Sequence, residues 1–228
     1  MIIGNGLLAK AFRDHEVDNK LLIFASGVSN SSETSLKAFE REEGLLVKAL
    51  KEHYLKKIVY FSTCSIYDSF FDKSAYTNHK INMKNIIQKI SRNYIIIRLP
   101  QVLGMNNKYQ LIGFLCQAIK DKKKFDLFNI ERNIIDIEDV KLIADYIIEH
   151  NIFKNRIVNI ANPKNIKVLE LVDLLKRVLK IKPRYTIVDK TGSLDICIND
   201  IRFIIDELNL FHENYIKERV SRYCERID

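Results

Sequence analysis

Residues 1–9 read Met1-Ile2-Ile3-Gly4-Asn5-Gly6-Leu7-Leu8-Ala9, a short apolar run followed by the pattern G-x-G-x-x-A. Where such a run is a strand and a helix follows, the first glycine permits a tight turn and the second lets a pyrophosphate approach the backbone. The third small residue lets the helix pack on the strand. We therefore expect a strand over residues 1–3, a helix from about Leu7, and a dinucleotide at the turn between them. A plain β–α turn that needs glycine only for its conformation is the alternative.

The rest of the chain continues this alternation of strand and helix. Short apolar runs typical of strands lie at residues 21–25, 57–61, 94–99 and 157–160. Helical periodicity predicts helices over 7–14, 34–54, 76–91 and 108–120, and later over 138–150, 168–179, 199–208 and 213–225, with an extended piece at 184–189. This order predicts an α/β fold with a Rossmann-like parallel sheet flanked by helices. We expect residues 1–104 and 133–160 to form the core, and 105–132 and 161–228 a small substrate lobe woven into it.

The composition limits the classes of protein that fit. The 228 residues are 47% hydrophobic and 29% charged, which is typical of a globular chain. Lys plus Arg (37) exceed Asp plus Glu (29), which leaves +8 and suits acidic partners. The lysine-rich segment 120–124 is expected to be a solvated loop, because no aromatic-interleaved basic motif accompanies it. Nucleic acid is therefore not an expected partner.

The cysteines and the apolar runs indicate the compartment. The four cysteines lie far apart with no C-x-x-C pair, so we expect neither a metal site nor a disulfide framework. A reducing, cytoplasmic location follows. No apolar run approaches the roughly 18 residues of a membrane span. Residues 1–4 also lack the charged start of a signal peptide, so no membrane partner is expected.

One element of the dinucleotide pattern is missing. The pattern predicts an acidic residue about 20 positions further on, at the end of the second strand, to hold the adenosine ribose. The region reads Phe24-Ala25-Ser26-Gly27 and has no carboxylate. Either residues 21–25 are the second strand of an unusual site, or the ordinary second and third strands are absent and this is a later strand.

A tyrosine and a lysine have the spacing of a catalytic pair. Tyr76 and Lys80 are four residues apart, which places phenol and ammonium on one face of a helix. A nearby cation favours the phenolate, so the pKa of Tyr76 is expected to lie well below its usual value of about 10. Thr63 follows the strand at 57–61, at the end of a parallel strand where α/β proteins bind ligands. The alternatives are a chance pair and an ordinary strand-end cap.

Neighbouring side chains are expected to be structural. Cys64 is predicted to be a buried small residue rather than a reactive thiol. His79 is predicted to face solvent, because it points about 100° away from Lys80. The stripe of helix 34–54 that faces the sheet is expected to be Leu36, Phe39, Glu43, Leu46 and Leu50.

Taken in order, these motifs resemble the extended short-chain dehydrogenase/reductase superfamily, also called the NAD-dependent epimerase/dehydratase family. The resembling segments are Gly4-Asn5-Gly6-Leu7-Leu8-Ala9, Phe61-Ser62-Thr63 with Tyr67 behind it, Ser74-Ala75-Tyr76 through Lys80, and residues 97–104, 132–140 and 159–163. The resemblance implies NAD or NADP as cofactor and a nucleotide-linked sugar as substrate.

The resemblance also implies roles for individual residues. A tyrosine like Tyr76 is the acid/base, a lysine like Lys80 holds the nicotinamide ribose and lowers the pKa of the tyrosine, and a hydroxyl like that of Thr63 binds the reacting oxygen. The implied cofactor-binding residues are Gly4, Asn5, Gly6, Leu7, Leu8, Ala25, Ser26, Phe61, Lys80 and Leu99. The implied substrate-binding residues are Cys64, Ser65, Gln101 and Arg132. Arg132 would bind the nucleotide phosphates; the alternative is a structural pair with Asp136 or Glu138.

The sequence departs from the family at defined places. Cys64 and Ser65 stand where the 4,6-dehydratases carry an Asp-Glu pair, so dehydration by that mechanism is not expected. Gln101 stands where many members have an asparagine. Aligning residues 21–25 with the fourth strand of the family deletes the second and third strands.

Two functions remain open from the sequence. The first is an NAD(P)-dependent nucleotide-sugar epimerase or keto-sugar reductase in surface-polysaccharide synthesis. The second is a non-catalytic binding or scaffolding subunit that has lost its dinucleotide site. Family members commonly dimerise through two helices per subunit, so a homodimer through residues 34–54 and 76–91 is expected.

Overall fold

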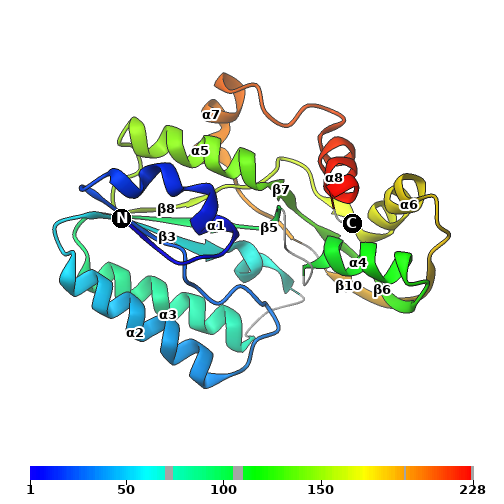
Figure 1. Cartoon of the computed structure of the whole chain (residues 1–228), viewed down its shortest axis with the longest axis horizontal. Helices are drawn as coiled ribbons and strands as arrows, with labels where there is room; N and C mark the ends of the chain where they lie inside the picture. The colour runs from blue at the N-terminus through cyan, green and yellow to red at the C-terminus, as the bar shows by residue number, and fades with distance from the viewer. Residues whose placement is uncertain (70–73, 105–109, 193, 227–228) are drawn as a thin grey trace.

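The computed structural model describes residues 1–69, 74–104, 110–192 and 194–226, and its main element is a parallel sheet of five strands (Figure 1). The strands are β1 (Ile2–Ile3), β2 (Leu21–Phe24), β3 (Lys57–Thr63), β4 (Tyr94–Leu99) and β8 (Arg156–Asn159), in the order β1-β2-β3-β4-β8. Every neighbouring pair is parallel. The predicted α/β fold with a parallel sheet is confirmed, and each strand lies close to its predicted position.

Strand β1 lies at the edge of this sheet. In the ordinary Rossmann order, 3-2-1-4-5-6, strands 2 and 3 lie on the far side of strand 1. Here the chain passes from β1 through helix α1 (Leu7–Ala11) and a 3-10 helix, η1 (Arg13–Val17), directly into β2. Strand β2 therefore takes the place of strand 4. The expected absence of the second and third strands is confirmed for the described residues.

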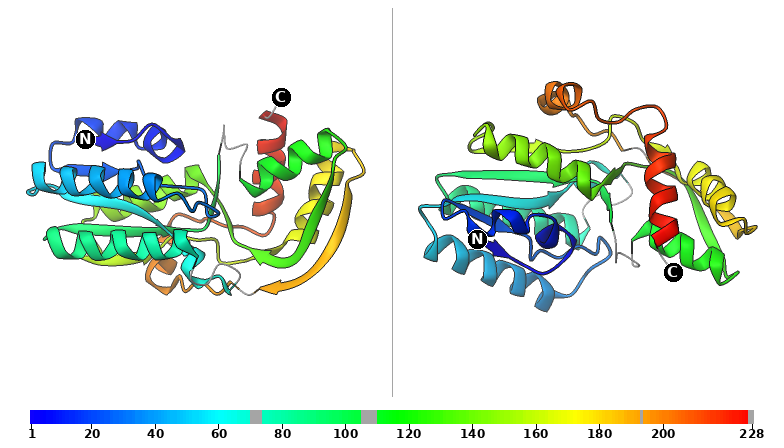
Figure 2. Two further views of the ribbon diagram at one scale, coloured as in Figure 1. Left: turned by 90° about the horizontal axis from the view of Figure 1, so that it is seen from below. Right: turned by 45° about the horizontal axis from the view of Figure 1, so that its top comes forward.

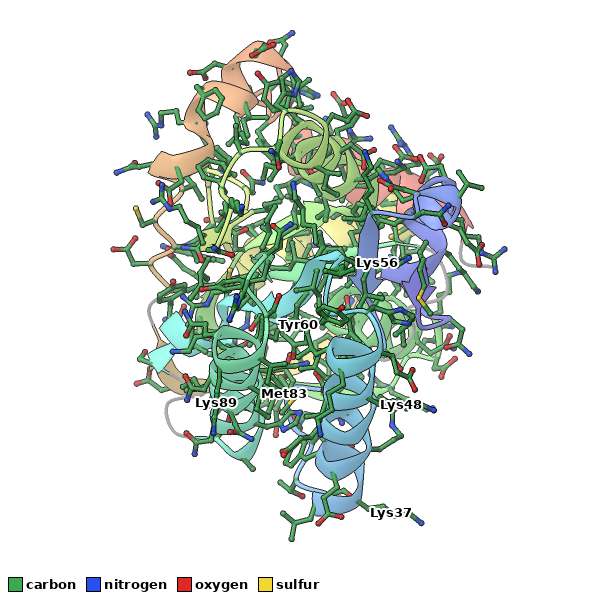
Figure 3. All side chains as sticks on the ribbon, turned by 90° about the vertical axis from the view of Figure 1, so that its left-hand side faces the viewer. Lys37, Lys48, Lys56, Tyr60, Met83 and Lys89 are labelled. Atoms are coloured by element: carbon green, nitrogen blue, oxygen red, sulfur yellow. The ribbon has the colours of Figure 1, made fainter. Side chains whose placement is uncertain are left out.

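Helices cover both faces of the sheet. Helices α2 (Leu36–Glu52) and α3 (Ala75–Ile90) lie side by side on one face, and α1 and α5 (Ile137–Glu149) lie on the other (Figures 1 and 3). In β3, Ile58 and Tyr60 belong to the core under α2 and α3, whereas Val59 and Phe61 belong to the opposite core. Because successive strand residues point to opposite faces, these consecutive apolar runs are the expected signature of a sheet buried on both sides.

Serine caps fix where α2 and α3 begin. The side chain of Ser35 accepts a hydrogen bond from the backbone N–H of Ala38, and that of Ser74 accepts one from Thr77. Such caps satisfy donors that have no partner inside the helix. The cap at Ser74 starts α3 so that Tyr76 lies in its first turn.

A smaller sheet lies beyond the carboxyl ends of the first (Figure 2). Its strands are β10 (Arg184–Gly192), β6 (Lys124–Arg132) and β9 (Ile166–Lys167), packed against α4 (Leu111–Lys120), α6 (Val168–Leu179) and α8 (Tyr215–Arg226). Strands β5 (Gln101–Leu103) and β7 (Ile134–Asp136) form a parallel pair between the two sheets. Lys124 begins a strand, so the lysine-rich segment is only in part the expected loop. The division of the chain into a core and a substrate lobe stays a prediction.

Residues 105–109, which begin the predicted lobe and precede α4, and residues 227–228 lie outside the described residues. The predicted helix 199–208 is divided into a 3-10 helix, η4 (Asn199–Ile201), and α7 (Arg202–Glu207).

Cys116 of α4 and Cys224 of α8 are free cysteines whose Sγ atoms lie 3.2 Å apart in the core between the smaller sheet and its helices. In the part of the chain that the structure describes, no helix combines the length and apolar character needed to cross a membrane.

Candidate active site

Two adjoining cavities lie at the carboxyl ends of the parallel strands. The larger has a volume of about 380 Å³ and the smaller about 220 Å³. Both are lined by Thr63 and Tyr76, together with Ser29, Pro100 and Gln110. The two residues predicted to handle the reacting oxygen therefore stand where the two cavities meet.

The larger cavity contains most of the residues predicted to bind a cofactor. Those that line it are Gly6, Leu7, Leu8, Ala25, Phe61, Lys80 and Leu99. Gly4, Asn5 and Ser26 belong to the adjoining loops and are not among its lining residues. The smaller cavity is lined by all four residues predicted to bind substrate: Cys64, Ser65, Gln101 and Arg132.

The glycines of the first turn differ in what requires them. Gly4 has φ +133°, and a Cβ at this position would lie 2.4 Å from the carbonyl oxygen of Ala25. Only glycine fits there, because the backbone conformation and the close approach both exclude a side chain. At Gly6 a Cβ would meet nothing within 4 Å. The space above Gly6 is thus open to a ligand in the larger cavity, as a dinucleotide phosphate would require.

Tyr76 is buried where the cavities meet. Its exposed fraction is 6%, and its phenol shares a hydrogen bond with Thr63. Thr63 in turn donates to the hydroxyl of Ser65 at 2.9 Å. Burial raises the pKa of Tyr76 to about 12; the Thr63 hydrogen bond acts in the opposite direction, and the charge of Glu42 adds to the rise. The predicted lowering of this pKa is therefore wrong.

A buried carboxylate that the sequence did not predict lies beside Lys80. Glu42 of α2 has an exposed fraction of 0%, and both of its oxygens accept hydrogen bonds from Lys80, at 2.9 and 3.1 Å. The hydroxyl of Tyr60 donates to Glu42 at 2.6 Å, His79 Nε2 lies 3.0 Å away, and the backbone N–H of Val28 donates at 2.6 Å. The positive charge of Lys80 is therefore matched by a negative charge beside it.

Glu42 stays ionised in this setting. Burial alone would raise the pKa of Glu42, but the hydrogen bond from His79, the charge of Lys80 and the bond from Tyr60 outweigh it and lower the pKa to about 2. His79 has an exposed fraction of 7% and stacks on Phe39 with the ring centroids 4.4 Å apart. The prediction that His79 faces solvent is wrong, because the α2–α3 contact covers it.

A signal for Glu42 was present in the sequence. It lies three residues after Phe39 and four before Leu46, both buried, and therefore on the stripe that faces the sheet. The predicted stripe is wrong at two positions: Leu36 has an exposed fraction of 74%, and the buried glutamate is Glu42 rather than Glu43. A charged residue at the centre of an apolar stripe needs a buried partner. The buried partner of opposite charge is Lys80, four residues after Tyr76.

Arg132 is held by a partner distant in the sequence. Its NH1 donates to Asp68 Oδ2 at 2.8 Å, and both side chains are buried. The alternative prediction, a structural pair, named Asp136 or Glu138, and the carboxylate in this ion pair is that of Asp68 instead. Asp136 instead caps helix α5 by accepting a hydrogen bond from the N–H of Glu138. A guanidinium and a carboxylate thus stand together in the wall of the smaller cavity.

The thiol beside Thr63 is structural in this geometry. Cys64 has an exposed fraction of 1%, as expected for a buried small residue, and burial raises the pKa of its thiol. A protonated thiol is a weak nucleophile. The cluster of possible metal ligands that the described residues do contain, Asp14, His15 and Asp145, lies elsewhere, and Lys141 bonds both of its carboxylates.

Comparison with known proteins shows which family and which folds the chain is similar to. The sequence model of the NAD dependent epimerase/dehydratase family matches residues 3–161. A search of curated proteins returned no match. Solved structures of similar fold include UDP-glucose 4-epimerase from Thermotoga maritima with UDP-glucose (14% identity, TM-score 0.68, covering 96% of this chain and 81% of that one). Another is dTDP-glucose 4,6-dehydratase from Bacillus anthracis in complex with NAD, with 14% identity and a TM-score of 0.67, covering 96% of this chain and 75% of that one. A third is UDP-N-acetylglucosamine 4-epimerase from Bacillus cereus, with 14% identity and a TM-score of 0.69, covering 98% of this chain and 84% of that one.

Proposed function

The chain belongs to the NAD-dependent epimerase/dehydratase family, and from this premise we propose that it is an NAD(P)-dependent enzyme acting on a nucleotide-linked sugar. The reaction is an epimerisation or a keto-sugar reduction in surface-polysaccharide synthesis. The observation that carries the proposal is the position of Thr63 and Tyr76 at the meeting point of the two cavities. A ligand in each cavity would bring its reacting atoms to this hydroxyl pair.

The larger cavity fits the nicotinamide half of a dinucleotide and its pyrophosphate. The open space at Gly6 gives the phosphates access to the backbone, and Lys80 lines the wall near Tyr76. NAD or NADP bound there supplies a hydride acceptor or donor at the nicotinamide. The second strand, whose end normally carries the carboxylate that binds the adenosine ribose, is absent among the described residues, so titration with both nucleotides decides between NAD and NADP.

The chain's own residues handle the proton. Tyr76 is protonated at neutral pH because burial raises its pKa to about 12. Its phenol can donate a proton to a sugar carbonyl oxygen, which leaves a phenolate. Only this phenolate can accept a proton from a sugar hydroxyl in the reverse direction. Thr63 hydrogen bonds to the same oxygen and keeps it within reach of Tyr76. Lys80 would contact the ribose from the cavity wall, with its charge paired to that of Glu42.

The smaller cavity fits a polyhydroxylated ligand that bears phosphates. Ser29, Ser65, Gln101 and Asn133 supply neutral hydrogen-bonding groups, and Arg132 supplies a guanidinium. Guanidinium groups match phosphate oxygens in geometry and charge. No carboxylate stands at Cys64 or Ser65, directly after Thr63, which argues against loss of water by the dehydratase mechanism.

Replacing Tyr76 tests this function. Tyr76→Phe is expected to lower turnover by roughly 10²- to 10⁴-fold, the usual contribution of a general acid or base. Binding of the nucleotide sugar should stay nearly unchanged. Reduction of UDP- and dTDP-linked keto-sugars is followed by the absorbance of the nicotinamide, and epimerisation of the linked hexoses, which leaves the nicotinamide unchanged overall, by separating the two sugar epimers. Tyr54→Phe, which alters an exposed tyrosine, is the control; turnover by Tyr76→Phe at the control rate would contradict the mechanism.

A homodimer through α2 and α3 belongs to the same proposal. Leu36, Leu45 and Ile81 are apolar side chains exposed on these helices. Light scattering should give twice the mass of the chain, and Leu45→Asp should lower it. A monomeric mass for the unaltered protein would contradict the dimer.

We also place the protein in the cytoplasm, because its cysteines are free, as is typical of reducing compartments.

The second candidate function is a binding or scaffolding subunit without catalysis. The specific observation in its favour is the absence, among the described residues, of the two strands that normally support the adenosine half of the cofactor. Such a subunit would keep the fold and bind neither NADH nor NADPH.

A further inference from the structure

Lys80 lies in an unusual position for a lysine that faces a ligand cavity. Its exposed fraction is only 3%, although it contributes to the wall of the larger cavity. An ammonium group that loses water in this way tends to lose its proton unless a charge compensates it. Burial lowers the pKa of Lys80, and the charge and hydrogen bonds of Glu42 act against this. Glu42 is thus the group that keeps this lysine charged.

Glu42 also fixes where the ammonium lies. The four-carbon stem of lysine is flexible, so its charge is located only when donors on the nitrogen are engaged. Here both carboxylate oxygens and the hydroxyl of Tyr60, at 3.3 Å, engage it. Figure 3 shows Tyr60 on the side of the sheet that α2 and α3 cover. The ammonium is therefore bound from α2 and from β3 at once.

The loop after β2 is built around this contact. A Cβ at Gly27 would lie 2.8 Å from Lys80 Nζ and 3.0 Å from Glu42 Oε1. The next residue, Val28, donates its backbone N–H to Glu42 at 2.6 Å. Gly27 and Val28 both line the larger cavity, whereas Glu42 does not. The carboxylate thus lies behind the cavity wall and acts on the cavity through Lys80.

We infer that Glu42 is a positioning residue for the cofactor: it holds the ammonium of Lys80, charged, at the wall of the larger cavity where the nicotinamide ribose binds. This inference rests on the proposed function, because it requires a dinucleotide in that cavity. Glu42 touches neither cavity itself. Its effect is transmitted by the ion pair with Lys80.

The competing explanation is an ion pair that serves only the fold. Replacing a buried ion pair by two uncharged side chains of similar size is often neutral for stability, whereas removing one partner is costly. A purely structural pair therefore predicts recovery of every property in the double variant. A positioning role predicts recovery of stability without recovery of cofactor binding.

The experiment compares NADH binding, measured by the fluorescence of the nucleotide, with stability, measured by thermal melting. The variants are Glu42→Gln, Lys80→Met, the double variant Glu42→Gln/Lys80→Met, and Glu42→Asp. The control is Glu40→Gln, which removes the same charge from an exposed position of the same helix. Glu42→Asp keeps the charge, and so tests the position of the carboxylate if Glu42→Gln does not fold.

The pH dependence of binding distinguishes the two roles. The groups that face Lys80 are Glu42 and Arg41 on α2, Tyr60 on β3 and the ring of Tyr76 on α3, with His79 bonded to Glu42. Measurements between about pH 7.5 and pH 9.5 lie above the ordinary pKa of histidine and below that of tyrosine. In this range the affinity of Glu42→Gln for NADH should fall as Lys80 loses its proton, and that of the unaltered protein should fall less.

Glu42→Gln and Lys80→Met each weaken NADH binding by about tenfold or more, and the double variant is no weaker than Lys80→Met, because Glu42 acts through Lys80. Glu42→Asp binds more weakly than the unaltered protein, with the same pH profile as it. Glu40→Gln binds normally.

Two different failures can be told apart. If the unaltered protein binds NADH while Glu42→Gln or Glu42→Asp binds it equally well at every pH, the inference is wrong and the proposed function stands. Restored binding in the double variant would also overturn the inference. If the unaltered protein binds neither NADH nor NADPH, the proposed function is wrong, and the assigned role of Glu42 is overturned with it.

Discussion

Lys80 lies one helical turn after Tyr76, with its Nζ 5.8 Å from the centroid of the tyrosine ring, and its ammonium is hydrogen-bonded to the carboxylate of Glu42. In a Tyr–Lys pair without a carboxylate, the cation favours the phenolate. Here the carboxylate balances the cation, so burial governs Tyr76 and raises its pKa to about 12. Before a ligand binds, the site therefore holds a neutral phenol beside a matched ion pair.

The ionisation of Tyr76 gives a first prediction. A pKa of about 12 in the folded state lies above the usual value of about 10, so Tyr76 adds to stability below pH 10, and this contribution is lost as the pH rises toward 12. Ultraviolet difference titration near 295 nm should show no tyrosinate from Tyr76 up to about pH 10. The signal is the difference between the unaltered protein and Tyr76→Phe. A tyrosinate step near pH 8 would contradict the account.

The buried carboxylate gives a second prediction, with the opposite sign. The hydrogen bonds and the charge of Lys80 lower the pKa of Glu42 from its ordinary value of 4.5 to about 2 in the folded protein, so its contribution to stability is complete above pH 4.5 and lost as the pH falls toward 2. The loss should be about 3 kcal/mol in the free energy of unfolding. Urea unfolding at a series of pH values measures it. The unaltered protein should lose more stability in acid than Glu42→Gln; equal losses would show that Glu42 is not the group responsible.

Much of the fold could be predicted because its signals are local. The apolar runs of β2, β3 and β4 and the short connection from β1 to β2 fix the sheet and its missing strands. Strand β6 was missed although Phe125, Leu127 and Ile130 are buried among exposed neighbours. The lysines before it suggested a loop. Exposed lysines can directly precede a strand. The alternation of apolar and polar residues after Lys124 therefore predicts the strand better than the lysines predict a loop.

The site was predicted in its parts but not in its electrostatics. Thr63, Tyr76 and Lys80 follow from spacing and position, and the structure brings them together. The pairing of Glu42 with Lys80 depends on the packing of α2 against α3, and that of Arg132 with Asp68 on two segments 64 positions apart. No local pattern encodes such contacts. The charge of a residue was visible in the sequence, and the partner that balances it was not.

The two glycines of the first turn give a third prediction. Gly4→Ala should destabilise the protein by roughly 2–4 kcal/mol, because φ +133° strains an alanine and its Cβ would lie 2.4 Å from the Ala25 carbonyl oxygen. Gly6→Ala should change stability by no more than about 0.5 kcal/mol, since its Cβ meets nothing within 4 Å. Urea unfolding compares them. Equal destabilisation by both substitutions would show that the turn has another geometry.

The smaller cavity gives a fourth prediction. Arg132→Lys keeps the charge beside Asp68 but loses the planar fork, so binding of UDP should weaken by about tenfold with little loss of stability. Asp68→Asn should strengthen UDP binding, because a carboxylate near the phosphates is removed. Calorimetry measures both. Arg156→Lys, in an exposed pair with Asp200, is the control. If both variants bind UDP as the unaltered protein does, Arg132 serves the fold alone.

The most direct test of the account is a titration of the protein with NADH and with NADPH, alongside Gly6→Val as a matched variant. A Cβ at Gly6 meets nothing within 4 Å, and a valine there projects from a lining position of the larger cavity. The account predicts saturable binding of at least one dinucleotide below about 1 mM, and loss of that binding in folded Gly6→Val. Absence of saturable binding for both dinucleotides, or binding that Gly6→Val leaves unchanged, would contradict it.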